Sequence, residues 1–267
     1  MTLRPIAGIV LRQIYLLRGS PVRVFPMVTW VAIDVVLWGF ITRYLNSVSG
    51  SGVNFAPALL GGVLLWDFCT RIMQGVSTAF LEDVWSRNFL NLFASPLSIS
   101  EYIAGLVITS VMTSFIGVIV MLVLATGVFH LQFFSLGIPL VAFFLVLFVF
   151  GITLGIFASA IVLRLGPASE WLLWPLPALL SPFAAVFYPL STLPQWMQWI
   201  AHALPPAYVF EGMRNLLSGH DFPTLLLMQG VVVAAVQLLL AAYFYARVYK
   251  HAVRTGLLAR YSAESAA

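Results

Sequence analysis

Residues Trp171–Leu217 read WLLWPLPALLSPFAAVFYPLSTLPQWMQWIAHALPPAYVFEGMRNLL, which begins like a membrane-spanning helix and then becomes rich in proline. Eight of the chain's fifteen prolines lie in or beside this stretch, between Pro167 and Pro206. Proline removes a backbone hydrogen-bond donor and interrupts a helix. Inside hydrocarbon, protein or water has to satisfy each freed backbone group. The stretch therefore predicts broken helices beside a cavity or pathway.

The composition of the chain is that of an integral membrane protein. Charged residues make up 8% of the 267 residues and apolar residues 61%, with a mean hydropathy of +1.01. Soluble domains average about 25% charged residues. No stretch remains for a separate soluble domain, and no phosphate-binding loop of the form G-x-x-x-x-G-K-[ST] occurs. We therefore expect a non-catalytic chain without a cofactor, so any ATP and Mg would be bound by a partner.

Other classes of site find little support. Cys69 is the single cysteine, so no disulfide forms within the chain. The four histidines have no metal-ligand spacing, so we expect no metal site. The basic residues behind the net charge of +4 flank the apolar runs. That placement favours contact with membrane lipid and not with nucleic acid.

Six stretches are long and apolar enough to cross a bilayer, because a spanning helix needs about 20 mainly apolar residues. They are about 24–45, 57–80, 102–127, 136–163, 169–189 and 223–248. Ahead of them, residues 1–22 include a basic amphipathic segment (3–17), typical of a cytoplasmic helix in the membrane interface. The fold class is thus an all-α membrane protein, with residues 1–267 forming one transmembrane domain.

Lysine and arginine set the expected orientation. Ten of these residues lie on the side of both termini and two, Arg43 and Arg214, on the other. Basic loops face the cytoplasm, so both termini are expected there and residues 190–222 outside. After the fifth span we expect two short re-entrant helices, with Trp196, Trp199 and Tyr208 at interfacial depth. The alternative is an amphipathic loop that rests on the membrane surface.

The cytoplasmic connection 81–100 predicts an amphipathic helix over residues 81–93. Pro96 ends it, and Ser98 or Ser100 can cap the third span with Glu101 in its first turn. Such a helix suits docking of a soluble partner, although a helix lying on lipid headgroups fits the pattern equally. The candidate docking residues are Glu82, Asp83, Trp85, Arg87, Phe89, Asn91 and Phe93.

Three charged residues lie inside the expected spans. Asp67 and Arg71 are four residues apart and share a helix face. Asp34 lies at a similar depth in the first span. An unpaired charge at mid-bilayer costs roughly 2.5–3.5 kcal/mol on insertion scales, so we expect Arg71 to bridge both aspartates. A role in contacting a substrate or an ion is the alternative.

Two further pairs point to packing. Gly151-x-x-x-Gly155 in the fourth span permits close approach of another helix. Glu211 and Arg214 form an i,i+3 pair on the second short helix, where such a pair usually steadies the helix.

Three features together resemble the permease of a type-2 ABC exporter. They are the interfacial helix before six spans, the segment FASPLSISEYIAG (93–105), and FYPLSTLPQWMQWIAHALPPAYVFEGMRNLL (187–217). The last contains F-x-P-L-x-x-L-P-x-W, similar to the family's motif after the fifth span. One departure is that Arg87 and Asn88 stand at the approximate position of a family glycine.

The resemblance implies that residues 82–95 contact one of two cytoplasmic ATP-binding subunits. It also implies a second permease copy as partner, most simply in a homodimer, and a prokaryotic inner membrane as location. Residues 187–214 would cap the pathway externally, and the first and fifth spans would line it. The candidate pathway and cap residues are Trp171, Trp174, Phe183, Phe187, Tyr188, Trp196, Trp199 and Tyr208.

The functional hypothesis is a permease for ATP-driven export. Its aromatic residues suit a polysaccharide or glycolipid and a drug-like or lipid-like amphipathic molecule equally. The alternative is a secondary transporter driven by an ion gradient, with Asp34, Asp67 and Arg71 as its relay. The sequence shows no inverted repeat for it. A membrane-embedded enzyme would need convergent catalytic groups, which the spans do not present.

Overall fold

The computed structural model describes residues 3–48, 56–86, 91–92, 95–130 and 137–257. These residues form helices and connecting segments and no strand, which confirms the all-α expectation. The helices are α1 (Leu3–Gly19), α2 (Pro21–Val48), α3 (Ala56–Trp85), α5 (Ile99–Gly127), α6 (Ile138–Leu165), η2 (Pro167–Leu172), α7 (Leu176–Leu180), η3 (Leu190–Thr192), α8 (Gln195–His202), α9 (Pro205–Leu217) and α10 (Thr224–Thr255).

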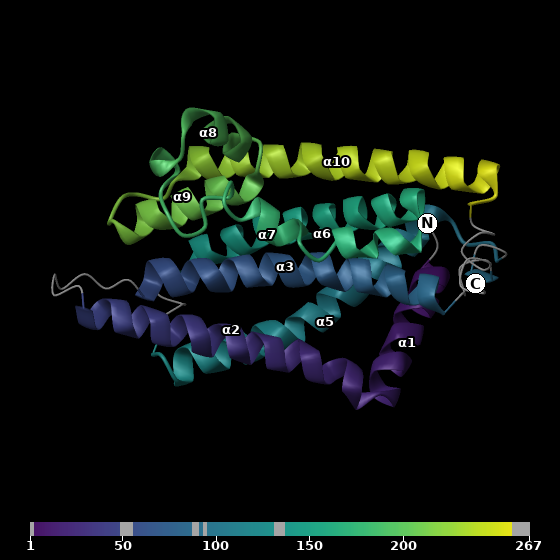
Figure 1. Cartoon of the computed structure of the whole chain (residues 1–267), viewed down its shortest axis with the longest axis horizontal. Helices are drawn as coiled ribbons and strands as arrows, with labels where there is room; N and C mark the ends of the chain where they lie inside the picture. Colours follow the sequence, from purple (N-terminus) through teal and green to yellow (C-terminus); the bar gives the residue numbers. More distant parts are fainter. Residues whose placement is uncertain (1–2, 49–55, 87–90, 93–94, 131–136, 258–267) are drawn as a thin grey trace.

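The long helices lie side by side in one bundle (Figure 1). Four of them contain a stretch long and apolar enough to cross a membrane: α2 from Val28, α5, α6 from Pro139, and α10. α3 has the length to do so, but its charged residues lower its hydropathy. The start of α1 and the end of α10 lie at the same end of the bundle, with α8 and α9 at the other.

The expected fifth span, 169–189, is not a continuous helix. It consists of η2, α7 and several turns, because Pro175, Pro177 and Pro182 interrupt the backbone ladder. The segment nevertheless runs the length of α3. Its Glu170 contacts Trp85 at one end of that helix, and its Val186 carbonyl lies against Gly62 near the other. Those two α3 residues are ~35 Å apart at the rise of an α-helix, comparable to a hydrocarbon core.

α3 is the central helix, and small residues bring its neighbours close. A Cβ atom added at Gly151 of α6 would lie 2.7 Å from the Cys69 carbonyl oxygen. One added at Gly155 would lie 2.6 Å from Cβ of Val76. The expected close packing at this glycine pair is therefore confirmed. On the α5 side, the Ser110 hydroxyl donates to the Ile72 carbonyl at 2.7 Å.

The start of α5 is set by a capping box, and Ser98 is the capping residue. Its hydroxyl accepts from the Glu101 amide, and the Glu101 carboxylate accepts from the Ser98 amide. α1 packs against this end of α5, with Ile9 seated over Gly105. α1 is thus partly held by protein, and its Gln13 is buried.

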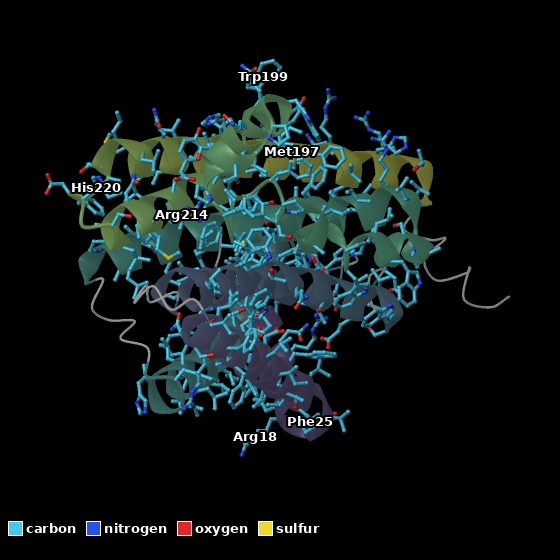
Figure 2. The ribbon with its side chains drawn as sticks, turned by 60° about the vertical axis from the view of Figure 1, so that its left-hand side comes forward. Arg18, Phe25, Met197, Trp199, Arg214 and His220 are labelled. Carbon is cyan, nitrogen blue, oxygen red and sulfur yellow. The ribbon has the colours of Figure 1, made fainter. Side chains whose placement is uncertain are left out.

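The two short helices expected after residue 190 are both formed, as α8 and α9. α9 is largely buried, whereas α8 lies on the outside of the bundle. A small apolar cluster of Leu193, Ala201 and Ala207, joined by Met197, connects the two. Figure 2 shows Trp199 directed away from the bundle, and its side chain is 69% exposed.

Candidate functional site

A cavity of about 630 Å³ lies among α1, α2, α3 and α5, and several charged and polar side chains line it. Trp174, from the irregular segment after α6, also lines it. A hollow with polar walls is unusual in so apolar a bundle, since a polar group without a partner is costly there. The cavity is therefore the candidate functional site.

One face of α3 supplies most of the polar wall. The lining residues recur at helical spacing, which puts them on a single face. Those with polar side chains are Asp67, Thr70, Arg71, Gln74, Thr78 and Glu82. This stripe extends ~22 Å at 1.5 Å per residue. Only Asp67, Arg71 and Glu82 of this stripe were predicted as candidate residues, although the helical spacing of the others was visible in the sequence.

Asp67 and Arg71 form the predicted ion pair. Nε of Arg71 lies 2.6 Å from Oδ2 of Asp67, and Nη2 lies 3.1 Å from Oδ1. The pair is bidentate and largely buried, so each charge offsets the other. The predicted second contact, from Arg71 to Asp34, is not an ion pair. Asp34 lines the same cavity within electrostatic range of both residues, and it has no hydrogen bond or ion pair to another described residue.

α5 contributes hydroxyl groups to the opposite wall. The Thr109 hydroxyl donates to the Gly105 carbonyl at 2.9 Å, and that of Thr113 donates to the Thr109 carbonyl at 3.1 Å. Both protons are therefore used within the helix, and the hydroxyl oxygens remain as acceptors. Gly117 leaves room for the Arg71 side chain, whose Cδ would lie 3.2 Å from an added Cβ.

Two buried polar groups on the cavity wall have no hydrogen-bond partner in the described structure. They are Nε2 of Gln13, on α1, and Oγ of Ser114, on α5; the two residues are 3% and 5% exposed. Both line the cavity. Buried polar groups are nearly always bonded to protein, water or a ligand, so these two point to an occupant of the cavity.

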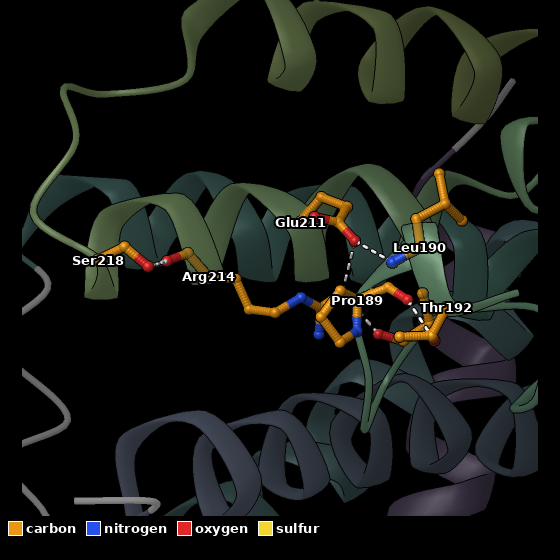
Figure 3. Close-up of polar contacts among 7 residues, drawn as sticks. Pro189, Leu190, Thr192, Glu211, Arg214 and Ser218 are labelled. Carbon is orange, nitrogen blue, oxygen red and sulfur yellow. Dashed lines mark hydrogen bonds and ion pairs between the residues drawn. The ribbon is translucent and has the colours of Figure 1, made fainter. Parts of the chain in front are cut away.

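Glu211 and Arg214 do more than steady α9. Nη2 of Arg214 donates to the Ala185 carbonyl at 2.8 Å, and the Glu211 carboxylate accepts from the Leu190 amide, as Figure 3 shows in part. The two side chains also pair with each other at 3.1 Å. Ala185 is buried and has a positive φ of 53°, a backbone conformation that non-glycine residues rarely adopt. The pair thus holds the non-helical segment in place from α9.

An ionic contact joins three helices at the opposite end of the bundle. Nη2 of Arg12, on α1, lies 2.6 Å from Oδ1 of Asp83, on α3. The Tyr102 hydroxyl, on α5, donates to Oδ2 of Asp83 at 2.8 Å. Burial raises the pKa of the Asp83 carboxyl, while Arg12 and Tyr102 act in the opposite direction.

The candidate docking residues lie in different environments. Asp83 is 2% exposed and bound as above, so it is not a surface contact in this structure. Glu82 lines the cavity, and Trp85 is exposed, with its indole N–H donating to Glu170 at 2.7 Å. Leu81 to Trp85 form the last turn of α3, not the start of a new helix. Asn91 is exposed, and Arg87, Phe89 and Phe93 lie outside the described residues.

The candidate pathway aromatics do not gather around one space. Trp174 alone among them lines the cavity, and Trp171 is exposed. Phe187 stacks on Trp38 of α2, and Phe183 makes an edge contact with Trp196. Tyr188 and Tyr208 each donate to a nearby backbone carbonyl. The structure therefore spreads these residues along the whole irregular segment and α8–α9.

Comparison with protein families gives one decisive match. A family model described as ABC-2 type transporter matches residues 20–217, which include most of the described bundle and the Glu211–Arg214 pair. The chain belongs to the ABC-2 type transporter family. It is a membrane subunit of an ABC transporter, and the family implies association with ATP-binding subunits. Comparison with curated proteins gives no match.

Proposed function

We propose that this ABC-2 subunit is the permease of an ATP-driven exporter, which pairs with a second permease copy and two cytoplasmic ATP-binding subunits. The supporting observation is that one helix, α3, carries the polar cavity wall and also leads into the expected docking segment. A movement at the end of α3 is therefore transmitted directly to the cavity.

The contacts at that end fit such a role. Arg12, Asp83 and Tyr102 join α1, α3 and α5, and Trp85 joins α3 to the irregular segment through Glu170. Three of the four helices around the cavity, and the irregular segment, are thus tied together next to the segment that follows Trp85. When the ATP-binding subunits close, a push on that segment moves these elements together and changes the shape of the cavity.

At the opposite end, α8 and α9 cover the bundle. In the proposal they dip into the outer leaflet and cap the pathway, with Trp196 and Trp199 at interfacial depth. The Glu211–Arg214 pair then sets the position of residues 185–190 relative to that cap. Both termini are cytoplasmic, and the membrane is a prokaryotic inner membrane.

The test is purification of the tagged chain from its native membrane in mild detergent, followed by mass spectrometry of the proteins that remain bound. We expect a stoichiometric ATP-binding subunit, which is lost when Trp85 and Phe89 are changed to Glu. Trp199→Glu is the matched control, because it makes the same change at the opposite end and should leave the complex intact. Retention of the subunit by the double variant would contradict the docking site. A chain that transports with no ATPase bound would contradict the proposal as a whole.

A further inference from the structure

The cavity among α1, α2, α3 and α5 is lined by the carboxyl groups of Asp34, Asp67 and Glu82, so acidic residues outnumber basic ones around it. Among the described residues around it, Arg71 is the single basic one, and both Nε and Nη2 of its guanidinium are bound to Asp67. The charge of Asp67 is offset in this way. Asp34 has no comparable partner, so an ionised Asp34 leaves the cavity with a negative charge to be balanced.

The hydroxyl groups on the α5 wall add to this preference. Thr109 and Thr113 line the cavity and use their protons within the helix, so their oxygens remain as acceptors. Two buried polar atoms there have no partner: Nε2 of Gln13, which is a donor, and Oγ of Ser114, which can donate or accept. An occupant of the cavity would supply the hydrogen-bond partners that buried polar groups nearly always have.

Tryptophans supply the apolar part of the site. Trp30 precedes Asp34 by four residues on α2, so the two share a helix face, and both line the cavity. Trp174 lines it from the irregular segment. An indole face attracts a cation through its quadrupole and also packs against apolar groups. A volume of about 630 Å³ lies within the range of drug-sized ligand sites.

We infer that the cavity binds an organic cation with an apolar body, with Asp34 as counter-ion and Trp30 and Trp174 against the apolar part. The inference rests on the proposed transport function, of which it names the substrate class. It favours a cationic amphipathic molecule over an anionic polysaccharide, which would place negative charge against Asp34. Two kinds of molecule carry such a cationic group: a soluble organic cation, and a lipid whose headgroup contains a cation such as choline.

The experiment compares two ions of similar shape and opposite charge, tetraphenylphosphonium and tetraphenylborate. Their binding to the full chain in phosphatidylglycerol nanodiscs is measured by equilibrium dialysis of radiolabelled ion, with empty nanodiscs as the blank. We expect saturable binding of tetraphenylphosphonium at least about tenfold tighter than that of tetraphenylborate, a difference of about 1.4 kcal/mol. Equal affinity for the two ions, or no saturable binding, would overturn the inference.

Variants then locate the site. Asp34→Asn is expected to weaken tetraphenylphosphonium binding about tenfold or more, whereas Asp34→Glu keeps it. Asp221→Asn makes the same chemical change at an exposed carboxylate outside the cavity and should have no effect. Wild-type affinity in Asp34→Asn would overturn the inference. If Asp34→Asn does not fold, the Trp30→Leu variant tests the inference instead. It keeps every charge and is expected to weaken tetraphenylphosphonium binding several-fold.

A second arm separates the two sources of the cation. Phosphatidylcholine added to the nanodiscs competes with tetraphenylphosphonium if a lipid headgroup is the natural occupant, and it has no effect if a soluble cation is. Both results support the shared chemistry. The binding assay needs no ATP-binding subunit. If tetraphenylphosphonium does not bind but an ATP-binding subunit co-purifies, only the inferred substrate class is contradicted. A positive result without a co-purified ATPase leaves the cation site standing and removes ATP-driven export.

Discussion

The two faces of α3 differ in how they pack: one is in close contact with a helix, and the other borders a cavity. Toward α6, Cys69, Ile72 and Val76 are buried against Gly151 and Gly155, and almost no space remains between the helices. Toward α1, α2 and α5, the same helix presents a polar stripe to a cavity of about 630 Å³. One face is closed by small residues on its partner, and the other is kept open by charged and polar side chains.

The difference separates the part of the fold that provides stability from the part that is available for function. A close-packed interface loses free energy when its volume changes by even one methylene. An open cavity wall tolerates changes in shape, provided that no charge is left unpaired. Substitutions on the two faces of α3 should therefore behave differently, and this contrast can be tested.

The largest expected effect is on the cavity face, where the charges are paired. Arg71→Leu leaves Asp67 without its cation, and we expect the free energy of unfolding to fall by about 3 kcal/mol. Chemical denaturation in mild detergent measures the change. The double variant Asp67→Leu/Arg71→Leu is the control and should recover most of the loss. A single variant as stable as the wild type would show that the pair does not matter for stability.

The next largest loss of stability is expected on the packed face, between α3 and α6. Gly155→Ala puts a Cβ atom 2.6 Å from Cβ of Val76, and overpacking of this kind costs about 2 kcal/mol. Thermal unfolding followed by size-exclusion chromatography detects it. Gly127→Ala makes the same change where no atom lies within 4 Å, so it should be neutral or slightly stabilising. Equal behaviour of the two variants would contradict the packing argument.

A smaller effect concerns the irregular segment that runs beside α3. Arg214→Gln removes the charged hydrogen bond to the Ala185 carbonyl, at a cost of about 1.5–2 kcal/mol. We expect faster amide hydrogen exchange in a peptide that covers residues 183–193. Arg164→Gln, at the exposed end of α6, should leave that exchange unchanged. Unaltered exchange in Arg214→Gln would mean that the segment is held by other contacts.

The smallest expected change in stability is at Gln74, and comparison with its neighbour Met73 tests the difference between the two faces of α3. Gln74 lines the cavity, whereas Met73 is 1% exposed on the packed side. Gln74→Met should change stability by less than about 0.5 kcal/mol, while Met73→Gln buries a polar amide and should be clearly destabilising. Denaturation midpoints of the two variants decide the matter. Comparable losses in both would show that the two faces do not differ as described.

Much of the fold was predictable from local pattern. The apolar runs predicted the regions of α2, α3, α5, α6 and α10, since length and hydropathy are properties of the sequence itself. The capping of α5 by Ser98 or Ser100 was also predictable, and the structure selects Ser98. The glycine pair on α6 predicted close packing correctly, although it did not name Cys69 and Val76 of α3 as the groups it meets.

The candidate site was predicted less well. The 169–189 segment was counted as a spanning helix on hydropathy, although its prolines predicted broken helices, and the backbone follows the prolines. Its aromatic residues were expected along one pathway, but a non-helical backbone directs side chains without a fixed period. The polar stripe on α3 was missed because Thr70, Gln74 and Thr78 are not charged. The helical spacing from Asp67 to Glu82 was the available signal.

The sequence by itself determined that this protein is a helical membrane protein of the ABC-2 type, since hydropathy, basic-residue placement and the motif over residues 187–217 are all local. Tertiary structure alone decided which face of α3 is open. The cavity exists because α1, α2 and α5 meet the polar face of α3 without filling it, and no single helix encodes that space. Ion pairing was decided partly by the sequence and partly by helix packing. Arg71 binds Asp67, which helical spacing places within reach, whereas the position of Asp34 depends on how two helices pack.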